Sequence, residues 1–382
     1  DKRTKIIATI SDKRCEVEFI RSLYEAGMNA VRINTAHVTT RSAATIVENV
    51  RRVSEKIAII IDTKGPEIRL TGMAAGFESG IPIEKGQLVR MKGTAEDRPS
   101  SDQTIYLNDP TIYDAVPTGS IILIDDGELE LQVVDKADDE LVCEVHNGGV
   151  IKPRKSVNIP GVPIDLPSVT DKDHEFINWA IDMDIDFIAH SFVRKKSDVL
   201  AVKKILKDRN SSIKIISKIE NSEGVDNIDE ILDETYGIMV ARGDLGVEIP
   251  AERIPVTQRL LVKKCIESKK PVIIATQMLH TMIEHPRPTR AEISDVANAI
   301  YQRVDAVMLS GETANGLYPV EAVATMARVA REIENDEVNN GPNIDMNLVR
   351  INNEITAQLA RSAVRASINL RVKAIVIDTL SG

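Results

Sequence analysis

Eight short apolar segments that alternate with amphipathic helical stretches constrain the fold of this 382-residue chain most strongly. They are residues 6–10, 30–34, 57–63, 186–192, 213–219, 237–241, 271–276 and 306–309. Near-continuous apolar strands alternating with helices are typical of a parallel sheet that is covered on both faces. Eight such units predict a closed (β/α)₈ TIM barrel, an α/β fold, and a doubly wound open sheet is the alternative.

The alternation breaks once, between about residues 70 and 169. Short alternating segments there, such as residues 128–134, are separated by turn sequences such as Asp126-Gly127 and Asn147-Gly148. This pattern predicts a small antiparallel β-barrel domain inserted after the third barrel strand. An insertion on the active-site side of a barrel is well placed to act as a lid.

These patterns divide the chain into four parts. We assign residues 1–69 and 170–340 to the barrel, 70–169 to the inserted β lid domain and 341–382 to the beginning of an incomplete C-terminal α/β domain. In that last part, residues 355–370 predict one helix and residues 372–378 one strand. A single helix and strand cannot close a core, so we expect the tail to dock on the barrel or the protein to continue.

Composition excludes several classes of protein. The chain contains no apolar run of about 18 residues, so we expect no membrane span, and its first residues lack the apolar stretch of a signal peptide. A net charge of −10 argues against non-specific nucleic-acid binding. Three widely spaced cysteines fit neither a disulfide framework nor a zinc site. We therefore expect a cytoplasmic protein.

Charged residues follow two neighbouring predicted strands. Lys218 and Glu220 share one face of their strand because they are two positions apart, and Asp244 closes the next strand. One ammonium and two carboxylates could hold Mg²⁺ or Mn²⁺ and neutralise a phosphoryl or enolate oxygen. The alternative is a strand-end salt bridge on the surface, which would contribute little.

The other predicted strands also end in polar residues, and in a (β/α)₈ barrel these ends build the active site. The residues concerned are Arg32, Asn34, His37, Asp62, Thr63, Lys64, Ser191, Arg194, Arg242, Thr276, Gln277, Ser310, Glu312 and Thr313. Arg32, Lys218 and Arg242 would supply positive charge, and Gly243 would let a carboxylate approach backbone N–H groups. The predicted substrate is a small anion whose phosphate and carboxylate groups are bridged by a metal.

Ordered blocks of sequence resemble the pyruvate kinase family. They are residues 4–9 (TKIIAT), 27–34 (GMNAVRIN), 62–69 (DTKGPEIR), 216–221 (ISKIEN), 239–246 (MVARGDLG), 275–279 (ATQML), 286–292 (PRPTRAE) and 308–314 (MLSGETA). The resemblance implies a glycolytic phosphotransferase that moves phosphate from phosphoenolpyruvate to ADP, giving pyruvate and ATP. It also implies a homotetramer.

The resemblance further implies roles for individual residues. Glu220 and Asp244 would bind Mg²⁺, and Lys218 would stabilise the phosphoryl group and the enolate. Arg32 would bind the phosphate, the backbone of Gly243 and Asp244 together with Thr276 would bind the carboxylate, and the enolate would be protonated near Thr276 and Ser310. K⁺ would be bound by Asn34, Asp62 and Thr63. The nucleotide would be contacted by His37 and Arg69, and a lid loop would carry Asp125 and Asp126.

One departure from the family pattern affects the implied K⁺ site. The family usually has Asn-Phe-Ser-His-Gly where this chain has residues 34–38 (NTAHV), so Ala36 replaces a serine whose hydroxyl helps to coordinate K⁺. Glu67 still resembles the K⁺-dependent form.

Two other functions remain open on the residues alone. A metal-dependent lyase or aldolase would also use acidic residues on a divalent ion to hold an enolate, but would need no ADP site. A catalytically silent binding protein should have lost Lys218, Glu220 or Asp244, and all three are present.

Overall fold

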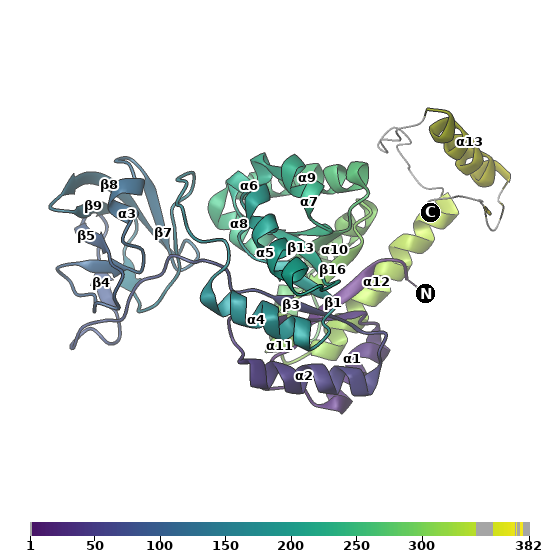
Figure 1. Ribbon diagram of the computed structural model, residues 1–382, viewed down its shortest axis with the longest axis horizontal. Coiled ribbons are helices and arrows are strands. Elements are labelled where there is room, and N and C mark those ends of the chain that lie inside the picture. Colours follow the sequence, from purple (N-terminus) through teal and green to yellow (C-terminus); the bar gives the residue numbers. More distant parts are fainter. Residues whose placement is uncertain (1, 341–353, 371, 373–374, 377–382) are drawn as a thin grey trace.

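Eight parallel strands form a closed barrel in the computed structural model, which describes residues 2–340, 354–370, 372 and 375–376 (Figure 1). Around the barrel the order is β1, β16, β15, β14, β13, β12, β3 and β2. Their bounds are β1 Lys5–Thr9, β2 Ala30–Asn34, β3 Ala58–Asp62, β12 Phe187–His190, β13 Lys214–Ile219, β14 Gly237–Ala241, β15 Val272–Ala275 and β16 Ala306–Leu309. The predicted barrel is confirmed, and the open sheet is excluded.

Alternation along each strand divides the side chains between two apolar layers. Ile216 belongs to the small cluster inside the barrel, whereas Ile215 and Ile219 belong to the large layer between strands and helices. Residues two apart on a strand share a face. Lys218 therefore continues the inward row of Ile216, and Asp62 continues that of Ile60. This arrangement brings Lys218 and Asp62, two of the predicted site residues, to the inner rim of the barrel.

Helices cover the outside of the barrel (Figure 1). They are α1 Val17–Ala26, α2 Thr40–Val53, α4 Asp171–Asp182, α5 Lys196–Asp208, α6 Ser222–Asp226, α7 Ile228–Glu234, α8 Arg242–Glu248, α9 Ile254–Ser268, α10 Arg290–Tyr301, α11 Gly311–Ala314 and α12 Pro319–Asn340, with the 3₁₀ turns η1 Ala251–Arg253 and η2 His280–Ile283. Helices α6 and α8 follow β13 and β14, the strands that carry Lys218 and precede Asp244.

A separate β unit lies between β3 and α4, at the predicted insertion point (Figure 1). Its elements are β4 Ile81–Ile83, β5 Leu88–Gly93, β6 Ile105–Leu107, α3 Ile112–Ala115, β7 Ile121–Ile124, β8 Leu129–Ala137, β9 Glu140–Val145, β10 Gly149–Ile151 and β11 Val157–Asn158. A six-stranded sheet has the order β11, β7, β8, β9, β5, β6, and β4 pairs with β10. The pairs are antiparallel except β5 with β6, which is parallel. The unit has its own apolar core.

The C-terminal part agrees with the sequence as far as it is described. Helix α13, Glu354–Leu370, matches the helix predicted over residues 355–370. The strand predicted over residues 372–378 lies largely outside the described residues, and the boundaries of the four parts stay predictions. Among the helices described, none combines the length and apolarity needed to cross a membrane.

Candidate active site

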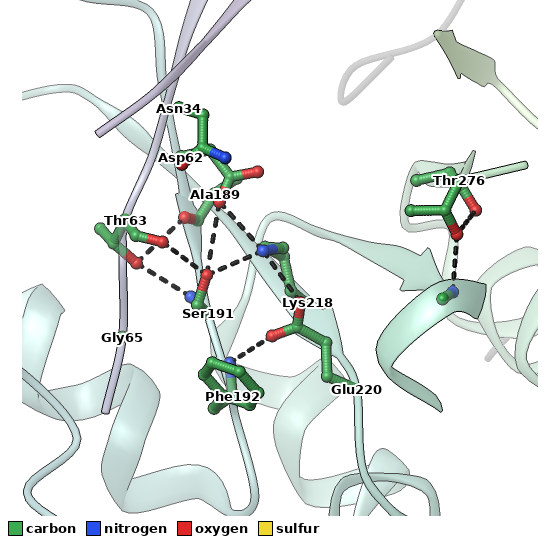
Figure 2. A network of polar contacts seen from close by, with 12 residues as sticks. Asn34, Asp62, Thr63, Gly65, Ala189, Ser191, Phe192, Lys218, Glu220 and Thr276 are labelled. Atoms are coloured by element: carbon green, nitrogen blue, oxygen red, sulfur yellow. Dashed lines mark hydrogen bonds and ion pairs between the residues drawn. The ribbon is translucent and has the colours of Figure 1, made fainter. Parts of the chain in front are cut away.

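Lys218 lies at the centre of a buried polar network on the inner rim of the barrel (Figure 2). Its ammonium Nζ is 3.0 Å from Asp62 Oδ1, 2.9 Å from Glu220 Oε1 and 2.8 Å from Ser191 Oγ. Burial alone would lower the pKa of Lys218, but the carboxylates of Asp62 and Glu220 outweigh burial and raise that pKa. Lys218 is therefore a fixed ammonium. The alternative of an exposed strand-end salt bridge is wrong, since the residue is 8% exposed.

Arg32 provides a second buried cation beside this network. Its Nε donates to Asp62 Oδ2 at 2.6 Å, and its Nη1 donates to Thr9 Oγ1 at 3.3 Å. Burial opposes the charge of Asp62, yet Arg32 and Lys218 together hold the pKa of this carboxyl below its usual range. Asp62 thus orients both cations.

Ser191 joins the network from the end of β12, although the sequence assigned it no individual role. Its hydroxyl donates to the Thr63 carbonyl at 2.6 Å and accepts from Lys218. Its backbone N–H donates to Thr63 Oγ1 at 3.0 Å. The only sequence signal was its place after an apolar strand, since its partner Thr63 is separated from it by 128 positions along the chain and its partner Lys218 lies on another strand.

Glu220 and Asp244 are the predicted ligands of a divalent cation. Both oxygens of buried Glu220 have partners, Lys218 Nζ and the backbone N–H of Phe192, the latter at 2.6 Å. The pKa of Glu220 is raised to about 7. Burial is the largest cause of this rise, Lys218 opposes it, and the nearby carboxylate of Asp244 adds to it. Asp244 is exposed, and no described residue donates a hydrogen bond to its carboxylate.

These two carboxylates fit a magnesium ion that keeps several water or substrate ligands. Mg²⁺ is commonly held by only one or two carboxylates together with substrate phosphates. Repulsion between Glu220 and Asp244 would be relieved by a cation. The described residues form no group of three or more His, Cys, Asp or Glu arranged as a complete metal site. The donor set therefore suits an ion shared with a substrate.

The predicted K⁺ ligands also lie close together, but their oxygens have protein partners. Asn34 and Asp62 face one another in the pairing of β2 with β3. The Asn34 side-chain oxygen accepts from the Ala36 N–H at 3.0 Å, and the Thr63 carbonyl accepts from Ser191. The second lone pair of each oxygen could still serve a cation. The site fits K⁺ with one ligand fewer, because Ala36 contributes a methyl group.

Thr276 and Gly243 form a second cluster, apart from the Lys218 network (Figure 2). The Gly243 N–H donates to Thr276 Oγ1 at 2.7 Å, and this hydroxyl donates to the Ala275 carbonyl at 2.6 Å. Thr276 has a φ of 68°, in the left-handed region that a β-branched residue rarely adopts. The predicted carboxylate-binding N–H is thus occupied by the Thr276 hydroxyl.

Arg242 donates to this cluster, but its positive charge is already paired with a carboxylate, which corrects the role expected for it. Its Nη1 forms an ion pair with Asp295 at 2.8 Å, and its Nη2 donates to the Thr276 carbonyl at 2.8 Å. The guanidinium therefore joins α8, the end of β15 and α10. Its charge is neutralised by Asp295, so it holds Thr276 in place rather than binding an anion.

Ser310, the residue after β16, has a buried hydroxyl without a hydrogen-bond partner among the described residues. Its backbone N–H donates to Glu312 Oε2 at 2.8 Å, while Glu312 Oε1 accepts from the Leu279 N–H at 3.1 Å. Buried Glu312 thus ties the loops after β15 and β16 together.

A cavity of about 710 Å³ lies between the barrel and the inserted sheet. The charged residues that line it include Arg69, Asp125, Asp126, Lys155, Glu220, Asp244 and Glu248. Arg69 pairs with Glu67 at 2.7 Å, and Lys155, which the sequence did not single out, pairs with Asp125 at 2.8 Å. His37 is exposed and is not part of this lining.

Comparison with known proteins agrees with this arrangement. Residues 1–323 match the model of the pyruvate kinase barrel domain. Over its whole length the chain is 49% identical to a pyruvate kinase of Borreliella burgdorferi, and the match covers 78% of that protein. It is also 47% identical to a pyruvate kinase of Geobacillus stearothermophilus and 46% identical to one of Staphylococcus saprophyticus. Each of these matches covers the whole chain and 65% of the relative. The chain thus spans about two thirds of the length of these last two relatives, and it belongs to the pyruvate kinase family.

Proposed function

We propose that the protein transfers a phosphoryl group from phosphoenolpyruvate to ADP and so makes pyruvate and ATP. The observation that carries this proposal is the buried Lys218 ammonium, held by Asp62 and Glu220 with Arg32 on the far side of Asp62. Phosphoryl transfer chiefly demands positioning and neutralisation of the charge on the transferred group. Two fixed cations on one rim supply both.

In the proposed reaction, Arg32 and Lys218 hold the phosphate of phosphoenolpyruvate. The bond between phosphorus and the enol oxygen breaks, and a new bond forms to a terminal oxygen of ADP. Lys218 then remains beside the enolate oxygen that is left. Because the carboxylates raise the pKa of Lys218, the lysine acts as a charge and not as the proton donor.

Thr276 would help to bind the substrate carboxylate, and Thr276 and Ser310 would lie near the water that protonates the enolate in the last step. The Gly243 N–H, which donates to Thr276 Oγ1, can donate to a substrate carboxylate instead when that hydroxyl turns aside. The enolate carbon gains its proton through water near Thr276 and near the Ser310 hydroxyl, which has no hydrogen-bond partner in the described part of the chain. A buried hydroxyl without a protein partner can donate a hydrogen bond to such a water or accept one from it.

Two cations complete the proposed site. Glu220 and Asp244 would hold Mg²⁺ or Mn²⁺, which supplies positive charge to the phosphate and enolate oxygens. Asn34, Asp62 and Thr63 would hold K⁺. Arg69, His37 and the additional residue Lys155 would contact the nucleotide, with Asp125 and Asp126 on the closing lid. We also propose a cytoplasmic homotetramer.

An assay of the full-length protein with phosphoenolpyruvate, ADP and Mg²⁺, with and without K⁺, tests this function. We expect pyruvate and ATP to appear in equal amounts. A lyase or aldolase would instead act on its carbon substrate without ADP. Absence of pyruvate from the full-length protein would overturn the proposal.

A further inference from the structure

One side-chain hydrogen bond connects the inserted sheet directly to a barrel helix. Asn158 Nδ2, on β11, donates to Glu248 Oε1, on α8, at 3.2 Å. Among the described residues, no other side-chain hydrogen bond or ion pair joins the strands β4 to β11 to a helix of the barrel. In Figure 1, α8 lies on the side of the barrel that faces the sheet. The contact therefore lies at the junction between the inserted sheet and the barrel.

Glu248 belongs to the same short helix as the proposed cation ligand. Asp244 lies in the first turn of α8 and Glu248 at its end, so their spacing of four residues places them on one face. Both line the cavity between barrel and sheet. Burial raises the pKa of Glu248, the hydrogen bond from Asn158 lowers it and Asp244 raises it. The Asn158 amide thus compensates for keeping this carboxylate half-buried beside another.

Asn158 is linked in turn to the loop that carries the two lid aspartates. In the pairing of β11 with β7, Asn158 faces Leu123 and Val157 faces Ile124, the last residue before Asp125. The Asp125 N–H donates to the Ser156 carbonyl at 3.0 Å, and the Ser156 hydroxyl donates to Asp126 Oδ1 at 3.0 Å. Displacement of Asn158 would therefore displace this loop.

We propose that Glu248 and Asn158 are positioning residues that fix the inserted sheet over α8. Their hydrogen bond sets the distance between Asp244, at one end of α8, and the loop of Asp125, Asp126 and Lys155 across the cavity. A nucleotide that bridges the barrel and this loop would then meet the two sides of its binding site at the separation that this hydrogen bond sets. The effect on catalysis rests on the proposed function, whereas the effect on the sheet does not.

Hydrogen–deuterium exchange of the protein without substrates tests the contact itself. Glu248→Ala should speed the exchange of residues 121–126 and 156–159 by about tenfold, since one hydrogen bond to a charged group is lost. Glu248→Gln should keep exchange near the wild-type rate, because its amide oxygen can still accept from Asn158. Asn158→Ala should match Glu248→Ala, and the double variant should be no faster than either. Glu252→Ala removes an exposed carboxylate four positions further on and should change nothing.

Steady-state kinetics then tests the consequence for the reaction. We expect Glu248→Ala and Asn158→Ala to raise the KM for ADP by about tenfold and to leave the KM for phosphoenolpyruvate nearly unchanged, with rescue by Glu248→Gln. Unchanged exchange in both alanine variants would overturn the positioning role. Altered exchange with unchanged kinetics would overturn its link to the nucleotide. Absence of pyruvate from the wild type would count against the proposed function while leaving the exchange result standing.

Discussion

Lys218 has three partners, which makes it the residue whose loss is easiest to interpret. Lys218→Met would leave Asp62 and Glu220 as buried carboxylates without their shared cation. We expect kcat for phosphoryl transfer to fall by at least a thousandfold and the free energy of unfolding to fall by about 3–5 kcal/mol. Coupled enzyme assays and urea unfolding measure the two effects. Lys214→Met, at an exposed position of the same strand, should change neither, and retained turnover in Lys218→Met would refute the assigned role.

Ala36 gives a second prediction at a single position. Restoring a hydroxyl with Ala36→Ser should add one ligand to the proposed K⁺ site, beside Asn34 and Thr63. A neutral polar contact contributes about 1 kcal/mol, so the K⁺ concentration for half-maximal rate should fall roughly fivefold. Titration of the rate with KCl, at constant ionic strength, measures it. Ala36→Val, which adds bulk without an oxygen, should not lower that concentration. Equal K⁺ requirements in Ala36→Ser and wild type would contradict the assigned site.

His190 provides a prediction about acid stability. It is fully buried at the end of β12, and neither ring nitrogen has a partner among the described residues. Burial lowers the pKa of His190 to about 4, although Asp198 and Asp173 oppose the shift and Lys218 adds to it. The unfolded chain therefore binds a proton below pH 6.5 that the folded chain does not bind until about pH 4.

This difference should destabilise the fold by about 3 kcal/mol as the pH falls from 6.5 to 4, with no contribution above that window. In urea unfolding at several pH values, His190→Asn should lack this decrease in the free energy of unfolding at acid pH. His174→Asn, at an exposed position of α4, should behave as the wild type does. Parallel pH profiles for His190→Asn and the wild type would contradict the argument.

At the scale of elements, the guanidinium of Arg242 connects three segments that sequence reasoning treated separately. It ties α8 to α10 through Asp295 and to the end of β15 through the Thr276 carbonyl. Arg242→Lys keeps the charge but cannot bridge both partners with a planar fork. We expect kcat to fall roughly tenfold to a hundredfold because Thr276 is misplaced, with little change in the KM for ADP. Arg259→Lys on α9, an exposed position, serves as control, and an unchanged kcat in Arg242→Lys would contradict the positioning role.

The sequence predicted the barrel strands well for a physical reason. A strand that is buried on both faces must be apolar almost throughout, so β14 and β16 have the bounds that their apolar runs predicted. Short half-buried strands leave a weaker signal, and the parallel pairing of β5 with β6 was not predicted. The ion pair of the Arg242 guanidinium and the hydrogen bonds of Ser191 join segments far apart in the chain, so no local pattern could reveal them.

At the scale of the whole molecule, the barrel and the inserted sheet have separate apolar cores, which predicts two units that unfold separately. One core packs the barrel strands against the helices, and another fills the inserted sheet, which meets the barrel helices through the Asn158–Glu248 contact. Units with separate cores and few shared contacts need not melt together. We therefore expect two transitions in calorimetry.

Mg²⁺ should distinguish these transitions, because Glu220 and Asp244 both belong to the barrel. A ligand at a hundred times its Kd stabilises the unit that binds it by about 2.7 kcal/mol, which raises the Tm of a unit of this size by about 5–10 °C. The barrel transition should therefore rise on addition of Mg²⁺ and return with EDTA, while the transition of the sheet should stay in place. Glu220→Gln should abolish the rise. A shift of the sheet alone, or one that persists in Glu220→Gln, would mean that the cation binds elsewhere.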